Sequence, residues 1–153
     1  MVNIGVIGYG YWGPNIVRNF KAIEKAKVSI VCDIDRETLR RIHKVYYDVK
    51  TVSDPSEVLT SPVIDAVAII TPVFTHYELA KKALENGKHI FVGKPFTSKV
   101  SEAEELIELA ERNNLKIMVD HTFLFTGAVK KIKEILDDNL LGQIYYYDST
   151  RVN

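Results

Sequence analysis

A short apolar run followed by three spaced glycines constrains this chain more than any other feature. The run Val2–Ile7 leads into GYGYWG, with glycines at positions 8, 10 and 13, and apolar residues then recur at helical intervals. A strand that turns through G-x-G-x-x-G into a helix is the layout of a dinucleotide site. In that layout Gly8 permits the tight turn, Gly10 lets a pyrophosphate approach the backbone, and Gly13 lets the helix pack close to the strand. A turn that merely packs well is the alternative.

An acidic residue at the right distance strengthens the dinucleotide interpretation. Asp33 lies 20 residues after Gly13, at the end of the second expected strand, where its carboxylate can accept hydrogen bonds from ribose hydroxyls. The same carboxylate would repel a 2′-phosphate, so NAD is expected, and NADP stays possible because Arg36 could neutralise the phosphate. Asp33 could instead cap the following helix, and Asp35 competes for both roles.

The chain alternates between short β-branched runs and longer segments with helical spacing, which is typical of a parallel sheet with crossover helices. We therefore predict an α/β fold of the doubly wound Rossmann type, with helices flanking the sheet. The expected strands cover residues 2–7, 28–35, 49–52, 63–70, 89–92 and 116–120. The expected helical segments begin near residue 11 and cover 36–46, 53–59, the segment closed by Asn86-Gly87, and 98–114.

The alternation of strand and helix segments changes after residue 120, where another helix and then a strand over residues 141–153 are expected. That strand carries three consecutive tyrosines and has no evident partner. We predict a dinucleotide-binding domain over residues 1–122. Residues 123–153 are expected to be the start, helix plus strand, of a second α/β domain that is otherwise missing. An edge strand on the first sheet is the alternative.

Composition excludes several other classes. The chain has 153 residues with 20 basic and 20 acidic side chains, so no nucleic-acid partner is expected. Its one cysteine, Cys32, excludes an internal disulfide and a cysteine-based metal site, and no metal site is predicted. We find no targeting segment and no run long enough to span a membrane, so a cytoplasmic protein is expected.

Polar residues follow two further strands of the expected sheet. Thr71 and Pro72 come directly after the fourth strand, with His76 close behind, and Lys94-Pro95 follows the fifth. The carboxyl ends of parallel strands meet at one edge, where the ligand crevice of such a sheet lies. These residues are therefore better explained as a site than as packing.

This combination resembles the glucose–fructose oxidoreductase / inositol dehydrogenase (Gfo/Idh/MocA) family, specifically its N-terminal nucleotide-binding domain. The likeness rests on GYGYWG, the acid in VCDID, TPVFTH and GKHIFVGKP, and it covers nearly the whole chain. The HTFLF run looks most like members that act on nucleotide-linked sugars such as UDP-N-acetylhexosamines or their uronates. The resemblance implies an NAD(P)-dependent sugar dehydrogenase that exchanges a hydride with a sugar hydroxyl or ketone, and a homo-oligomer for the full-length form.

The resemblance also implies roles for single residues. Lys94 would lie beside the reacting hydroxyl and help to position it and move its proton, since an ammonium stabilises a developing alkoxide. Thr71 and Pro72 would shape the wall against the cofactor, and Lys94 and Pro95 are also expected to contact it. His76 would either line the nicotinamide pocket or cap its helix.

Two aromatic side chains inside the glycine loop complete the expected cofactor contacts. Tyr11 and Trp12 are predicted to lie over the pyrophosphate loop, with ordinary packing as the alternative. His121 follows the sixth strand and is expected to line the pocket or bond locally rather than to act as an acid–base.

One departure from the family pattern bears on activity. Members usually carry a glutamate directly before the lysine, and this chain has Gly93. That glutamate would contact the nicotinamide end of the cofactor, so its loss leaves nucleotide binding intact and puts turnover in question. A nucleotide-binding sensor without chemistry is therefore a second hypothesis. A methyltransferase is a third, but it gives Lys94 no role.

Overall fold

The computed structural model describes residues 1–150 and 152. The chain divides into two compact units, Met1–Asp120 and His121–Asn153, and each is described by itself. Residues 151 and 153, the last part of the expected final strand, lie outside the described residues.

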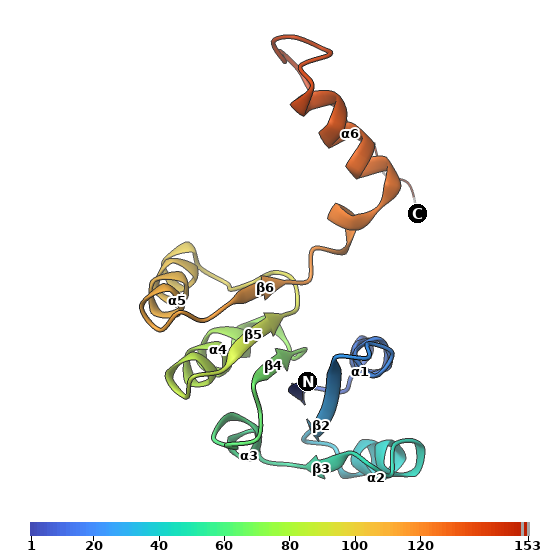
Figure 1. Cartoon of the computed structure of the whole chain (residues 1–153), viewed down its shortest axis with the longest axis vertical. Coiled ribbons are helices and arrows are strands. Elements are labelled where there is room, and N and C mark those ends of the chain that lie inside the picture. The colour runs from blue at the N-terminus through green and yellow to red at the C-terminus, as the bar shows by residue number, and fades with distance from the viewer. Residues whose placement is uncertain (151, 153) are drawn as a thin grey trace. The chain divides into compact units, whose positions relative to one another are not determined.

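The first unit is built on a six-stranded sheet in which every pair of neighbours is parallel (Figure 1). The strand order is β3-β2-β1-β4-β5-β6. The chain therefore adds β2 and β3 on one side of β1 and then β4, β5 and β6 on the other, as in a doubly wound nucleotide-binding fold. This confirms the predicted fold class. The strands are β1 (Val2–Ile7), β2 (Ala26–Cys32), β3 (Lys50–Val52), β4 (Ala66–Ile69), β5 (His89–Val92) and β6 (Ile117–Val119).

Helices cover both faces of this sheet (Figure 1). Side chains of α1 and α2 join one buried cluster with β1 and β2, and side chains of α3, α4 and α5 join a second cluster on the opposite face. Strands buried on both sides read as continuous apolar runs, which is why β4 shows no polar alternation. The helical segments of this unit are α1 (Gly13–Lys21), α2 (Arg36–Val45), α3 (Ser56–Leu59), the 3-10 turn η1 (Val73–Thr75), α4 (His76–Glu85) and α5 (Val100–Arg112).

Local sequence signals explain where these helices begin and end. Pro14 lies in the first turn of α1, where an amide donor is not needed. Asp35 caps α2, because its carboxylate accepts hydrogen bonds from the amides of Glu37 and Thr38 at 3.1 Å each. The chain leaves α4 through Gly87 at a φ of +71°, as expected for the Asn86-Gly87 stop.

The first helix is shorter than the sequence indicates. It begins at Gly13, not near Tyr11, and it ends at Lys21. Ile23, which fits the helical spacing, therefore lies beyond the helix and is exposed. The apolar spacing continued past the end of the helix because Ile23, in the following turn, falls by coincidence at a helical interval from Phe20.

The second unit contains the 3-10 turn η2 (Thr122–Phe125) and the helix α6 (Gly127–Asp137). Residues 141–150 form no strand, so the expected strand is wrong over that range, and so is its edge-strand alternative. A strand must pair its backbone groups with a neighbour, and the described part of this unit offers none. Tyr145, Tyr146 and Tyr147 are accordingly exposed.

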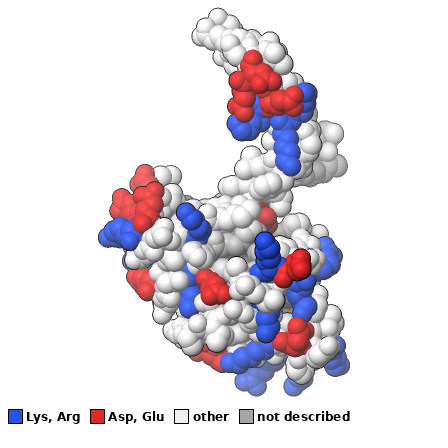
Figure 2. All heavy atoms as spheres, viewed as in Figure 1, with Lys and Arg blue, Asp and Glu red and all other residues white. Residues whose placement is uncertain are grey.

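Charged side chains of both signs are interspersed over the face shown in Figure 2. The formal net charge of the chain is zero. None of the helices in the described part of the chain is long and apolar enough to cross a membrane.

Gly8 is the position at which the turn from β1 to α1 depends most on the absence of a side chain. Its φ is +96°, and a Cβ built there would lie 2.5 Å from the carbonyl oxygen of Ile70. The Gly8→Ala variant should therefore lose about 2–4 kcal/mol of unfolding free energy. Urea denaturation followed by circular dichroism measures this.

Gly10→Ala is the matched control, because a Cβ at Gly10 has no heavy atom within 4 Å. Its unfolding free energy should stay within about 0.5 kcal/mol of the parent value. Equal denaturation midpoints for the Gly8 and Gly10 variants would contradict the assigned strain.

Candidate functional site

The register of the parallel strands brings the predicted site residues to one edge of the sheet. The last residues of five strands lie level with one another, as the pairs Ile7–Cys32, Ile7–Ile69, Ile69–Val92 and Val92–Val119 show. The glycine loop, Asp33, the Thr71 segment, Lys94 and Asp120 follow those strand ends. Sequence positions far apart in the chain therefore share a single crevice edge.

A cavity of about 620 Å³ opens at this edge where the strand order reverses. Five of the predicted cofactor residues line it: Gly8, Gly10, Asp33, Thr71 and Pro72. The remaining lining residues are Ile7, Cys32, Ile34, Pro55, Ile70, Phe74, Thr75, Glu78 and Leu79. The cavity is thus formed by the ends of β1, β2 and β4 together with η1 and α4.

The glycine loop presents backbone donors at the start of α1. The amide of Gly8 is already bonded to the carbonyl oxygen of Cys32 at 2.8 Å. Within the described residues, Gly10, Tyr11 and Trp12 donate no backbone hydrogen bond. Unpaired amides at a helix N-terminus, together with the helix dipole, favour a negatively charged group such as a diphosphate.

Asp33 holds the glycine loop in place as well as facing the cavity. Its Oδ2 accepts a hydrogen bond from the Tyr9 amide at 2.7 Å, and its Oδ1 accepts one from the Asp35 amide at 2.8 Å. The helix-cap alternative for Asp33 is wrong, because Asp35 caps α2. Each carboxylate oxygen has a second lone pair, so Asp33 can still accept from a ribose hydroxyl.

Two exposed apolar side chains flank the cavity and were missed by the sequence analysis. Ile34 is 90% exposed and Phe74 is 76% exposed, and both line the cavity, so a ligand bound there would remove apolar surface from water. They are suited to the faces of a flat ring such as adenine. The sequence held one signal for these two residues: each is an apolar residue a few positions after the end of a strand.

The charges around the cavity disfavour a further phosphate. Its charged lining residues are Asp33 and Glu78, and its described lining includes no lysine or arginine. Carboxylates accept hydrogen bonds from hydroxyl and amine groups and repel an additional anion. The lining therefore suits a ribose with two hydroxyls.

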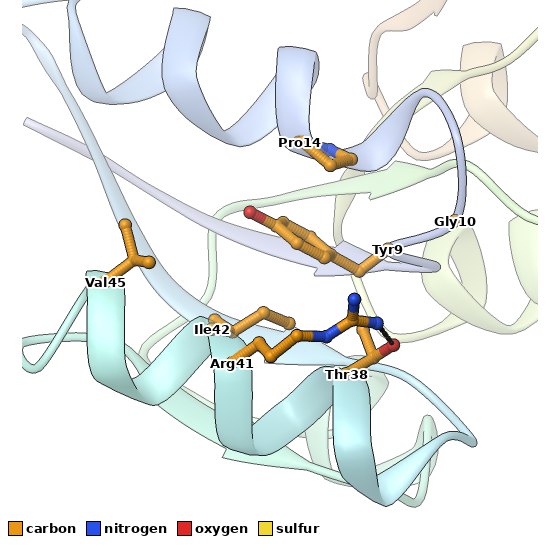
Figure 3. A pocket seen from close by; sticks show the side chains of 7 residues that line it. All are labelled: Tyr9, Gly10, Pro14, Thr38, Arg41, Ile42 and Val45. Carbon is orange, nitrogen blue, oxygen red and sulfur yellow. Dashed lines mark hydrogen bonds between the residues drawn. The ribbon is translucent and has the colours of Figure 1, made fainter.

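Arg36, the counter-charge considered for NADP, does not line either of the cavities beside Gly10. A smaller cavity of about 340 Å³ lies on the far side of Gly10, between α1 and α2, and contains Arg41 (Figure 3). The Arg41 guanidinium lies under the Tyr9 ring and donates to the Thr38 hydroxyl at 2.8 Å. Thr38 in turn donates to Asp35, so Arg41 belongs to the hydrogen-bond network that caps α2.

Cys32 lines the main cavity but is not a nucleophile. Burial, with a smaller effect from the neighbouring Asp33 carboxylate, raises the pKa of its thiol to about 12. The thiol is therefore protonated at neutral pH, which disfavours thiolate chemistry at this position.

His76 lies outside the cavity and does not cap α4. The N-cap residue is Thr75, and the His76 ring is buried between two loops. Its Nδ1 is 2.9 Å from the Pro95 carbonyl oxygen, and its Nε2 is 2.8 Å from the Thr71 carbonyl oxygen. A neutral imidazole carries one N–H, so it donates to one of these oxygens at a time. His76 therefore ties the loop after β4 to the loop after β5.

Lys94 and Pro95 follow β5 and are exposed. Lys94 forms no ion pair with the residues that the structure describes. A Cβ at the neighbouring Gly93 would have its nearest atom, the Ile69 carbonyl oxygen, at 3.6 Å, which is ordinary contact. Gly93 is thus not required by packing, and the Lys94 amine is available at the crevice edge.

Tyr11 and Trp12 differ in their surroundings. Tyr11 is 95% exposed, whereas the Trp12 indole Nε1 donates to Asp120 Oδ2 at 2.7 Å. The two rings stack with centroids 6.4 Å apart. Neither lines the main cavity.

These features fit a nicotinamide dinucleotide. The unpaired amides beside Gly10 and the open space above that residue would take the diphosphate, Asp33 would take the adenosine ribose, and Ile34 with Phe74 would take the adenine. Gly13 cannot carry a side chain, because a Cβ at this position would lie 2.7 Å from the Gly8 carbonyl oxygen.

Known proteins agree with this geometry. Residues 2–121 match the family model described as "Oxidoreductase family, NAD-binding Rossmann fold" (GFO_IDH_MocA). The chain is 34% identical over 148 residues to the uncharacterized oxidoreductase YdgJ of Escherichia coli, covering 97% of this chain and 42% of YdgJ. It is 34% identical over 152 residues to scyllo-inositol 2-dehydrogenase (NAD(+)) of Bacillus subtilis, covering 99% of this chain and 43% of that enzyme.

A solved structure of a related enzyme has the same fold. Scyllo-inositol dehydrogenase from Lactobacillus casei, crystallised with NAD(H) and scyllo-inositol, superimposes with a TM-score of 0.84 at 26% identity, over 93% of this chain and 42% of that protein. The chain spans about two fifths of the length of these relatives. On the family match over most of its length, the chain belongs to the Gfo/Idh/MocA oxidoreductases and is an NAD-binding Rossmann domain of that family.

Proposed function

We propose that this domain serves a dehydrogenase that exchanges a hydride between NAD and a hydroxyl or ketone carbon of a polyhydroxylated ring, a sugar, nucleotide sugar or cyclitol. The observation that carries the proposal is the shared edge: the unpaired amides beside Gly10 and the Lys94 side chain follow strands whose ends lie level. The inositol dehydrogenases among the relatives support the ring substrate.

In this proposal NAD, when bound, supplies the hydride acceptor. The residues of the chain bind the cofactor and orient it and the substrate. Gly10 and the following amides hold the diphosphate, and Asp33 holds the adenosine ribose. Lys94 would hydrogen-bond the reacting hydroxyl, stabilise negative charge on its oxygen and move its proton.

His76 would act as a positioning residue for Lys94. It is buried, and its two ring nitrogens lie within hydrogen-bond distance of the carbonyl oxygens of Thr71 and Pro95, so it can donate to either one. A lysine on an exposed loop has many rotamers, so a fixed backbone beneath it reduces the entropy lost when it engages the substrate.

The nucleotide-binding part of the proposal is tested by Gly10→Ala. The added methyl meets open space in the chain alone, so stability is retained, but it would collide with a diphosphate held against the loop. We expect the dissociation constant for NADH to rise at least about tenfold, a cost of about 1.4 kcal/mol. Isothermal titration calorimetry measures it.

Gly127→Ala is the matched control, because a Cβ there also has no heavy atom within 4 Å and the residue lies in the second unit. Its NADH affinity should equal that of the parent chain. Undiminished NADH binding by Gly10→Ala would contradict the placement of the diphosphate. Asp33→Ala is a poorer test, since it also removes the acceptor for the Tyr9 amide.

The catalytic part is tested by Lys94→Ala. We expect kcat to fall about 100-fold or more, because a positioned proton-transfer group is lost, while NADH affinity is kept. Nicotinamide absorbance measures turnover on a panel of cyclitols, free sugars and nucleotide sugars. Turnover equal to that of the parent chain would remove Lys94 from the mechanism.

A sensor domain without chemistry is the second candidate, and Gly93 is the observation that favours it. A Cβ at Gly93 is accommodated at ordinary contact distances, the nearest side-chain atom being His76 Cε1 at 3.7 Å. Gly93→Glu should therefore fold and bind NADH as the parent does. If the parent binds NADH without turnover on the panel and Gly93→Glu gains turnover, the sensor is favoured; measurable parent turnover favours the enzyme.

We further propose that residues 123–153 begin a second domain that contributes the substrate wall and the homo-oligomer contacts. Support comes from α6, which carries exposed Ile132 and Leu136, and from the lack of any buried residue in the described part of the second unit. A cytoplasmic location stays a prediction.

A further inference from the structure

One side-chain hydrogen bond joins two loops at the carboxyl edge of the sheet that are distant in sequence. The Trp12 indole Nε1 donates to Asp120 Oδ2 at 2.7 Å across 108 residues. Trp12 is the N-cap residue of α1 but makes no side-chain cap, so its one side-chain donor is committed to Asp120. We call this pair the Trp12–Asp120 latch.

The sheet order fixes what lies beneath the latch. Trp12 belongs to the loop that leaves β1, and Asp120 directly follows β6. Between those strands lie β4 and β5, so the two ends are three strand spacings apart, or about 14 Å. The loop and the indole together must cross that distance along the carboxyl edge, past the ends of β4 and β5. The latch therefore runs along the part of the edge from which Lys94 leaves the sheet.

The position of the latch separates it from the adenosine part of the crevice. The main cavity is formed by the ends of β1, β2 and β4, and neither Trp12 nor Asp120 lines it. Gly8 and Gly10 of the glycine loop line the main cavity, whereas Trp12 in the same loop does not. A dinucleotide whose diphosphate rests on that loop and whose adenosine fills the main cavity must extend its other half toward β5 and β6.

The Trp12 side chain is partly open to solvent, so a ligand could cover more of it. Trp12 is 42% exposed although its N–H is bonded, and it stacks on Tyr11 at an interplanar angle of 22°. A large apolar ring that is fixed in orientation and partly open to solvent gains free energy when a flat ligand covers it.

We infer that the latched Trp12 indole is the wall against which the nicotinamide half of the dinucleotide packs, with Asp120 as the positioning residue that orients it. This inference rests on the proposed function, because it needs a dinucleotide in the crevice. It assigns to Asp120 and Trp12 a part in ordering the reactive half of the cofactor beside Lys94, separate from the contacts that hold adenosine and diphosphate.

The test compares NADH with ADP-ribose, which keeps the adenosine, the diphosphate and the second ribose but lacks the nicotinamide. Asp120→Ala and Trp12→Phe both remove the latch, the first by deleting the acceptor and the second by deleting the N–H. We expect each to weaken NADH binding about tenfold and to change ADP-ribose binding by less than about twofold. Calorimetric titration gives both dissociation constants.

Asp120→Asn is the rescue variant, because its amide oxygen still accepts from the indole. It should bind NADH within about twofold of the parent chain. Asp48→Ala is the matched control, since it breaks the bond between an exposed aspartate and Lys21 at the other end of α1. Its affinities for both ligands should equal those of the parent, and circular dichroism verifies that every variant is folded.

Tryptophan fluorescence supplies a second readout, because Trp12 is the one tryptophan in the chain. NADH absorbs where indole emits, so a nicotinamide packed on Trp12 should quench its emission strongly and produce sensitised nicotinamide fluorescence. ADP-ribose should bind without energy transfer, and Asp120→Ala should lower the transfer at saturation.

The outcomes separate the two proposals. No NADH binding by the parent chain overturns the proposed function and this inference together. NADH binding with equal affinity in the parent and in Asp120→Ala overturns only the inference, and so does equal weakening of NADH and ADP-ribose. Selective loss of NADH affinity with rescue by Asp120→Asn supports it.

Discussion

The close approach of three backbone segments at Gly8 is the constraint on which the site depends. The chain must leave β1, reverse over the end of β4 and enter α1 within a few residues, and it does so with Gly8 at a φ of +96° against the Ile70 carbonyl oxygen. Gly13 then packs against Gly8, at a distance that admits no side chain. Because the turn is this tight, the unpaired amides of residues 10–12 lie directly before α1, at the edge of the sheet where the strand order reverses.

Asp33 connects that turn to the neighbouring strand. A carboxylate at the end of β2 could have served the ligand alone, yet both of its oxygens accept backbone amides, one from the glycine loop and one from the start of α2. The group expected to recognise ribose therefore also sets the shape of the loop expected to recognise diphosphate. Because of this coupling, any substitution at Asp33 should disturb the glycine loop as well as ligand binding, whatever the ligand.

The sequence predicted the parallel sheet, its strands and five of the residues that line the main cavity, because those features depend on short-range patterns: apolar runs, glycine spacing and the residue that follows a strand. It did not predict Ile34 and Phe74 as walls, or the bonds of His76 and Trp12, since these depend on strand register and on side chains that meet across the sheet. The strand expected over residues 141–150 failed for a related reason. Aromatic content suggests a strand, but a strand forms only where a partner satisfies its backbone.

The two ends of the crevice edge differ in how completely this chain builds them. At the ends of β1, β2 and β4 there is a cavity with apolar walls and a carboxylate, beside a loop with unpaired amides. At the ends of β5 and β6 there are an exposed lysine, a glycine that leaves room for a side chain, and an aspartate that holds the Trp12 indole. Binding free energy scales with buried area and satisfied donors, whereas rate depends on how precisely a few groups are oriented. Affinity for the nucleotide should therefore reside in the first region, and the chemistry in the second, where additional protein surface would be needed to exclude water from a ring substrate.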